Sequence, residues 1–368
     1  MSQMACMDNE GLFHRAVVMS AMIRSPYQVG GIGVPEELWH AEENGQHFLS
    51  FLGCSTIEQA RKLDAATIRD KYEEYTKIFP AMFTVLDHKF CVGDPMVLFM
   101  EGKHVNVPVM SGNTSDEVPS YIEASSKEDL KKKAEEIFGK NAETFLRFPE
   151  AMQEDSDGKY AKVNGIECTI KCLFSEKKSA GEKKPYYYYR FDPDIPGWDN
   201  AGTFHSVDLW FFFETLAKCW RPFVGQHYDL SRMMCNYWVN FIKTGDPNGN
   251  DADGKPMPYW YPYEKEKPCE MIFMSDRPVV NCGWVTPFKE FLQEQIKKTL
   301  PIGKVFHKEW LEPIWEGGYC FRETFAAVAD ENGCRASFLW TPKEVLSVES
   351  YDGETVYEEG IDYLVEED

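Results

Sequence analysis

The chain has 368 residues, 43% of them hydrophobic, which is enough for one large core or for one large and one smaller domain. Sixty acidic residues against 39 Lys and Arg give a formal net charge of −21. A surface this acidic repels phosphate backbones, so we expect no nucleic-acid partner. The longest apolar run, residues 16–23, is far too short to cross a bilayer, so we expect no membrane partner either.

Eleven cysteines are scattered along the chain, and none forms a C-x-x-C pair. A zinc site or a thioredoxin-like motif therefore has no support, and we predict no metal and no cofactor. Scattered cysteines in a chain of this size indicate reduced, partly buried thiols in the cytosol. The first six residues lack the basic start and apolar stretch of a signal peptide, which also favours a cytoplasmic location.

Short apolar runs and helical segments alternate in the first part of the chain. Residues 16–20 form an apolar, β-branched run typical of a buried parallel strand. The glycine-rich residues 30–33 are not followed by G-K-[ST], so we interpret them as a loop rather than a phosphate cradle. Pro35 then opens a helix that closes at Gly53. Residues 55–58 form a capping box for another helix.

The same alternation continues into the middle of the chain. Ser126 begins a helix that ends at Gly139. Residues 107–110 and 186–191 are further candidates for buried strands, and the first of them leads directly into the polar segment 111–117. Strands separated by helices, with polar loops after the strands, indicate an α/β domain built on a mostly parallel sheet.

The clearest predicted helix runs from about Asp229 to Lys243, and Gly245 with Pro247 ends it. Seven apolar side chains fall on one of its faces at helical spacing. These are Leu230, Met233, Met234, Tyr237, Trp238, Phe241 and Ile242. We interpret its aromatic residues as core, not as a substrate-stacking surface.

The composition changes after about Leu300, where an alternating, strand-like pattern replaces the helical one. Residues 351–353, Tyr-Asp-Gly, are a hairpin turn signal. The sequence therefore predicts an α/β domain over residues 1–299 and a small β-rich module over residues 300–368.

A search for a nucleophile by motif gives a negative result. The elbow pattern G-x-S-x-G occurs nowhere, since the only glycines four apart are Gly245 and Gly249 with Pro247 between them. No H-G-G-G-like oxyanion loop occurs either. Among eight histidines and sixty acids, residue chemistry alone does not single out a site.

Three stretches carry recognisable motifs: Gly11–Ser20, Pro108–Glu117 and Gly202–Asp208, the last together with the helix and turn of residues 230–249. All three resemble the type B carboxylesterase/cholinesterase family. The resemblance covers roughly residues 1–285. It implies the C-terminal portion of an α/β-hydrolase, a mostly parallel sheet with flanking helices, and a carboxylic-ester hydrolase that works through an acyl-serine.

In that family a Ser, a Glu or Asp, and a His form the catalytic triad in that chain order. Carried onto this sequence, Glu117 matches the acid and His205 the base. A carboxylate that accepts from His Nδ1–H fixes the tautomer, while Nε2 takes the serine proton. The adjacent Asp116 is an alternative acid. Val118 stands where the family usually has glycine, which leaves the local backbone conformation open.

Two other residues near these motifs receive structural interpretations. His14 lies in the family pattern outside the triad, so we expect a structural role for it. We expect Asp208 to cap the helix that follows it rather than to transfer protons.

The resemblance places the nucleophile serine before Met1, because the family's elbow directly precedes a stretch like Met1-Ser-Gln. We therefore expect this chain to be an inactive fragment of a serine esterase that acts on small-molecule esters. The alternative is a non-catalytic, cholinesterase-like binding or adhesion module that lacks the nucleophile. The tail, notably residues 350–353 and 357–363, faintly resembles the β-rich module ahead of some bacterial SGNH-type esterase domains, and it would then be truncated too. Such a pairing suits acylated carbohydrates as substrates.

Overall fold

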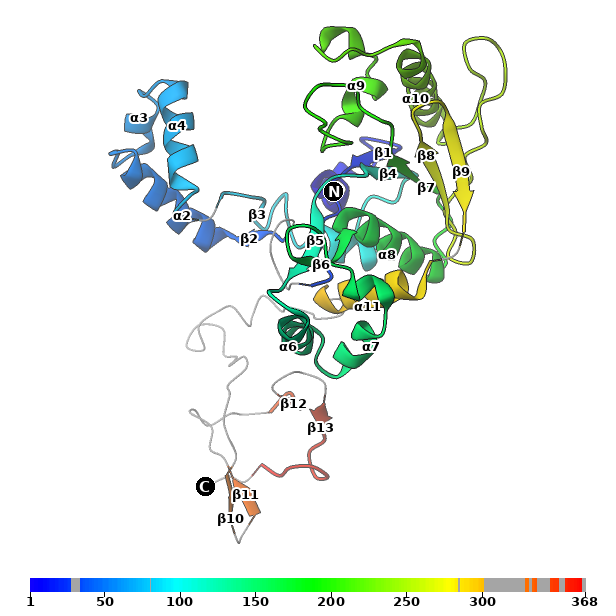
Figure 1. Ribbon diagram of the computed structural model, residues 1–368. Coiled ribbons are helices and arrows are strands. Elements are labelled where there is room, and N and C mark those ends of the chain that lie inside the picture. The colour runs from blue at the N-terminus through cyan, green and yellow to red at the C-terminus, as the bar shows by residue number, and fades with distance from the viewer. Residues whose placement is uncertain are drawn as a thin grey trace. The chain divides into compact units, whose positions relative to one another are not determined.

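A computed structural model describes most of the chain. The described residues are 1–27, 34–79, 81–283, 285–300, 328–330, 333–335, 345–350 and 355–365. The chain divides into two compact units, Met1–Ile302 and Gly303–Asp368. Helices and strands alternate through the first unit (Figure 1).

The described helices all lie in the first unit. They are α1 (Ser2–Ala5), α2 (Leu38–Phe51), α3 (Ile57–Ala60), α4 (Ala65–Tyr75), α5 (Pro95–Met100), α6 (Lys127–Phe138), α7 (Ala142–Leu146), α8 (Gly165–Ser179), α9 (Asp208–Phe212), α10 (Gly225–Thr244) and α11 (Pro287–Thr299). Short 3₁₀ turns occur at Met7–Asn9, Gly139–Asn141, Pro149–Met152 and Leu216–Lys218.

The strands of the first unit form one larger sheet and two small pairs. They are β1 (Ala16–Met19), β2 (Glu36–Glu37), β3 (Val85–Leu86), β4 (Val109–Thr114), β5 (Pro119–Glu123), β6 (Lys159–Asn164), β7 (Tyr186–Phe191), β8 (Cys269–Phe273) and β9 (Pro278–Cys282). The sheet has the order β1-β4-β7-β8-β9. Its first four strands are parallel and β9 is antiparallel to β8. The predicted α/β class with a mostly parallel sheet is confirmed.

Strand β7 shows why this sheet is covered on both faces. Tyr187 and Tyr189 pack in a core cluster with side chains of α9 and α10, whereas Tyr186 and Tyr188 pack in another cluster with side chains of α5 and α8. Successive side chains of a strand point to opposite faces, so four consecutive buried tyrosines require a helical layer on each side. The continuous apolar run that predicted this strand reflects that double burial.

Strand β4 begins two residues later than predicted and extends through residues expected to form a loop. All six of its residues are buried, including polar ones. Ser111 Oγ donates to Val18 O at 2.7 Å, and Asn113 Oδ1 accepts from Tyr188 Oη at 2.8 Å. Because neighbouring strands satisfy these polar groups, the strand tolerates a polar sequence that predicted a loop.

Helix α10 contains the predicted helix and starts at Gly225 instead of Asp229. The extra turn is closed by Val224 N, which donates to His227 Nδ1 at 3.0 Å, a capping contact without the usual Ser, Thr, Asp or Asn signal. Gly245 ends the helix in the left-handed conformation, with φ +85°, as predicted. The predicted apolar face is wrong at Ile242, which is 56% exposed.

The shorter helices agree with their predicted capping signals in part. Ser126 caps α6 and Gly139 follows its last residue, as predicted. For α3 the cap is Thr56, whose side chain accepts from Gln59 N, so the box predicted at residues 55–58 is shifted by one residue.

Two cysteines contradict the prediction that the thiols are reduced. Cys269 and Cys282 face each other across the antiparallel strands β8 and β9 and form a disulfide. Cys6, Cys54 and Cys91 are among the free, buried cysteines that fit the prediction. Because disulfides persist mainly in oxidising compartments, the cysteines no longer support the cytosolic location predicted from the sequence.

The second unit contains short antiparallel strand pairs. Strand β10 (Val328–Asp330) pairs with β11 (Gly333–Arg335), and β12 (Val348–Glu349) pairs with β13 (Val356–Tyr357). The predicted turn at 351–353 lies outside the described residues.

Candidate functional site

Glu117 lies just beyond the carboxyl end of β4, and its buried carboxylate has three donors. One oxygen contacts Nδ1 of His205. The other accepts from Ser20 Oγ at 2.5 Å and from Thr114 N at 2.7 Å. A carboxylate held at both oxygens has a fixed orientation, so it can fix the ring of the histidine that it contacts.

His205 lies in the loop between β7 and α9, and its side chain is 58% exposed. Glu117 binds its Nδ1, and within the described residues its Nε2 has no hydrogen-bond partner. An exposed imidazole held at Nδ1, with no described partner at Nε2, can take a proton from an approaching hydroxyl and later return it. The structure thus brings together the two residues predicted as acid and base.

Asp116, the alternative acid, does not contact His205. It links the loop after β4 to the loop between β7 and α9. Its Oδ2 accepts from Thr203 N at 2.9 Å and from Thr203 Oγ1 at 3.0 Å. Gly202 makes this contact possible, because a Cβ there would lie 2.5 Å from the same oxygen and its φ is +63°. Of the two neighbouring carboxylates, only Glu117 is placed to orient the imidazole.

Three residues around the pair have left-handed backbone conformations. They are Ser20 with φ +47°, Val118 with φ +38° and Ser206 with φ +71°. The sequence left open which backbone conformation Val118 adopts. The backbone has the left-handed conformation that suits glycine, although the residue is β-branched. Strain of this kind persists where surrounding contacts fix the backbone, and it often marks functional sites.

Asp208 does not cap α9, which corrects the prediction. It is the first residue of that helix, and Val207 occupies the cap position without a side-chain cap. The buried carboxylate instead accepts from Tyr189 Oη at 3.0 Å. Burial raises the pKa of Asp208 to about 6, and the negative charge of Glu117 adds to this effect.

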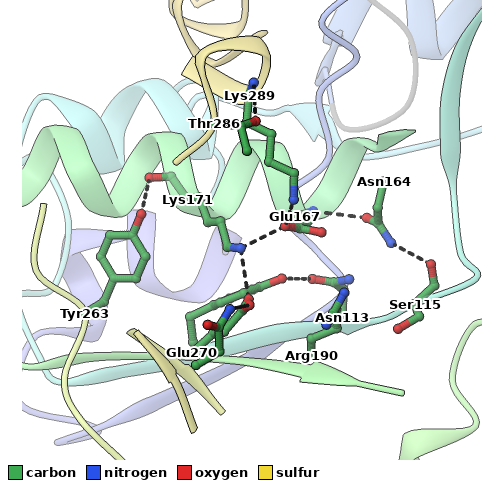
Figure 2. Close-up of polar contacts among 12 residues, drawn as sticks. Asn113, Ser115, Asn164, Glu167, Lys171, Arg190, Tyr263, Glu270, Thr286 and Lys289 are labelled. Atoms are coloured by element: carbon green, nitrogen blue, oxygen red, sulfur yellow. Dashed lines mark hydrogen bonds and ion pairs between the residues drawn. The ribbon is translucent and has the colours of Figure 1, made fainter. Parts of the chain in front are cut away.

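Asn164 connects helix α8 to the acid loop, the segment after β4 that carries Asp116 and Glu117 (Figure 2). Its Oδ1 accepts from Glu167 N at 3.0 Å and so caps the helix. Its Nδ2 donates to Thr114 O at 2.9 Å and to Ser115 O at 3.4 Å. The backbone next to Glu117 is therefore fixed to the start of α8 by one side chain.

Glu167 belongs to a network of four charges, also drawn in Figure 2, in which three side chains are largely buried and Lys289 is 37% exposed. Glu167 binds Lys171 at 2.8 Å and Lys289 at 2.6 Å, and Lys171 also binds Glu270 at 2.9 Å. Burial alone raises the pKa of Glu167, but the two ammonium groups outweigh it and lower the pKa to about 2. The network joins α8, α11 and β8 behind the acid loop.

Ser20 and Asn164 were missed by sequence reasoning. Ser20 is separated from Glu117 by 97 positions, and nothing local identifies it as a partner. Asn164 had a usable signal, because Asn164-Gly-Ile-Glu167 fits an N-cap followed three residues later by glutamate. His14 is exposed and makes no hydrogen bond among the described residues.

Other kinds of site find no support in the part of the chain that the structure describes. No three His, Cys, Asp or Glu side chains are grouped so that they could hold a metal ion. No described helix is both long enough and apolar enough to span a bilayer. Across the same residues no serine, threonine or cysteine side chain hydrogen-bonds to His205.

Parts of the chain are similar to known proteins. Residues 163–281 match the carboxylesterase family. Bile salt-activated lipase of Rattus norvegicus is 24% identical over 304 residues, which cover 70% of this chain and 47% of that protein. Cocaine esterase of Homo sapiens is 21% identical over 287 residues, covering 70% and 49%. The chain thus spans about half the length of the curated relatives it matches.

Solved structures show the same fold. A PNB esterase is 22% identical and superposes with a TM-score of 0.52, covering 78% of this chain and 59% of that one. Its likeness supports the order of parallel strands and flanking helices described above. The chain thus resembles carboxylesterases in the sequence of residues 163–281, and its fold is that of the α/β-hydrolases.

Proposed function

We propose that Glu117 and His205 are the acid and the base of a serine esterase that hydrolyses small carboxylic esters. The contact between the Glu117 carboxylate and Nδ1 of His205 carries the proposal. His205 Nε2 would take the proton of a serine hydroxyl as its oxygen attacks the ester carbonyl, and would return that proton to the departing alcohol. Water would then release the acyl group by the same route in reverse.

We further propose that the 368-residue chain by itself turns over no ester. The motif G-x-S-x-G is missing from its sequence, and no described hydroxyl contacts His205. The nucleophile would come from polypeptide outside this sequence. A non-catalytic binding module that keeps the acid–base pair is the second candidate, favoured by the same missing motif.

The coding DNA and transcript around this sequence provide the test. We expect an in-frame G-x-S-x-G upstream, and a protein that includes it should hydrolyse p-nitrophenyl acetate. There, Glu117→Gln and His205→Ala should each lower kcat by at least 10³-fold, while His14→Ala should leave it unchanged. A transcript without the motif would rule out the proposed esterase and leave the binding module, whereas activity that survives His205→Ala would show that His205 is not the base.

A further inference from the structure

Two tryptophans, one on the loop that carries His205 and one on the segment after α9, expose their rings to solvent. Trp198 precedes His205 by seven residues and is 87% exposed, and Trp220 follows α9 and is 58% exposed. Their ring centres are 5.8 Å apart, with planes inclined by 37°. Large exposed apolar side chains that lie together are informative, because water contact costs free energy that a ligand can recover.

The pair is held in place by a buried arginine. Arg221 binds both carboxylate oxygens of Asp199, at 2.9 and 2.7 Å, and also donates to Pro196 O at 3.1 Å. Its guanidinium carbon lies 4.7 Å from the centre of the Trp220 ring. A bidentate ion pair that also stacks on an indole restricts the rotamers of both residues.

The backbone beside Trp198 fits closely against this support. A Cβ on Gly197 would lie 2.5 Å from Arg221 Nη1 and 3.3 Å from the Trp220 ring. The loop that carries Trp198 therefore packs directly on Arg221 and Trp220. The exposed rings belong to a packed structure, which lowers the entropy that a ligand must overcome.

The same arginine links the pair to the proposed base. The Arg221 guanidinium carbon also lies 5.2 Å from the centre of the Phe204 ring, and Phe204 directly precedes His205. A ring bound on the two tryptophans would thus be anchored to the loop that carries the base.

The charges around the pair select the ligand. The Arg221 guanidinium already lies over one face of the Trp220 ring, so that face is not open to a second cation. The chain's net charge of −21 disfavours anions. A neutral ring remains. An open pair of indoles covers only one side of a ligand, which suits a pyranose because its hydroxyls stay hydrated, whereas an aromatic ring would leave an apolar face in water.

We propose that Trp198 and Trp220 form a binding platform for a neutral sugar ring, the alcohol part of the ester that the Glu117–His205 site would cleave. The substrate class that follows is acylated carbohydrates, and this part of the proposal rests on the proposed esterase function. Binding of the sugar ring rests only on the geometry of the tryptophan pair.

Binding of neutral oligosaccharides to the full 368-residue chain tests the platform without any turnover. Xylohexaose and cellohexaose are titrated while tryptophan fluorescence and heat are recorded. We expect saturable binding to the unmodified chain, weakened at least tenfold by Trp198→Ala and by Trp220→Ala. Trp39→Ala is the matched control, because Trp39 lies on α2 and is 66% exposed, and it should leave the affinity unchanged.

Several results would overturn the platform. They are no saturable binding of either oligosaccharide, unchanged affinity in both platform variants, or tighter binding of tetramethylammonium or p-nitrophenol than of the sugars. Trp198→Phe, which keeps an aromatic ring, separates a folding defect from a lost contact, since it should retain part of the affinity. Because no ester is cleaved, failure here leaves the test of Glu117 and His205 unaffected.

Discussion

Replacing Asp208 with asparagine removes a buried carboxyl group that is costly to ionise. The pKa of Asp208 is raised from 3.8 to about 6 in the folded chain, mainly by burial. Each unit of difference corresponds to about 1.4 kcal/mol, so a shift of about two units corresponds to roughly 3 kcal/mol. Asparagine keeps an oxygen that can accept from Tyr189 Oη and carries no charge, so Asp208→Asn avoids this cost.

The sign of the effect follows from proton binding. Between about pH 3.8 and 6 the folded chain binds more protons at Asp208 than the unfolded chain does, so its stability falls as pH rises through this window. Above pH 6 the loss is complete. We therefore expect Asp208→Asn to gain up to about 3 kcal/mol relative to the unmodified chain between pH 4 and pH 7.5.

Urea unfolding of both proteins at pH 4, 5, 6 and 7.5 measures this difference. Glu167→Gln is the matched comparison of opposite sign, because the pKa of Glu167 is lowered to about 2 from 4.5. That carboxylate stabilises the fold above about pH 4.5, and its contribution is lost as pH falls toward 2. An Asp208→Asn protein less stable than the parent at pH 7.5, or a difference that does not vary with pH, would refute the reasoning.

Three further predictions concern stability. Asn164→Ala should lower the free energy of unfolding by about 1–3 kcal/mol, because it removes both the cap of α8 and the donor to the acid loop. Asn164→Asp retains the cap, so it should lose less stability in the same urea titration. At Val118, with φ +38°, the glycine variant should be about 1 kcal/mol more stable than the alanine variant by thermal unfolding, and the reverse order would show that the backbone is not left-handed there. Cys269 and Cys282 are 13 positions apart in sequence, and reduction of their disulfide should lower the free energy of unfolding by about 3 kcal/mol. Peptide mapping without reductant should recover the two cysteines linked.

The comparison of α10 with β4 shows how far local patterns reach. The apolar spacing from Leu230 to Phe241 predicted a helix, because one turn repeats every 3.6 residues wherever the chain lies. The polar residues of β4 predicted a loop, whereas β1 and β7 provide partners for the side chains of Ser111 and Asn113 within a strand. Where a strand begins and ends thus depends on its neighbouring strands, which the sequence pattern of the segment itself does not reveal.

The candidate site divides in the same way. The motif resemblance predicted Glu117 as the acid and His205 as the base, and it left Asp116 as an alternative acid. Only the arrangement of loops placed Glu117 on the imidazole and Asp116 on Thr203. Ser20 was not predictable, because its contact with Glu117 spans 97 positions and depends on the order of strands in the sheet.

By itself the sequence determined the α/β class, the buried strand at Tyr186–Phe191, the helix ending at Gly245 and the family resemblance around His205. These features are encoded in residues that are neighbours along the chain. The tertiary structure decided which carboxylate faces His205, which cysteines pair, and that Trp198 meets Trp220. The contact of Glu117 with His205 joins residues 88 positions apart that meet only when the sheet assembles. The other two depend on the pairing of β8 with β9 and on the packing of loops against Arg221, which local sequence patterns do not specify.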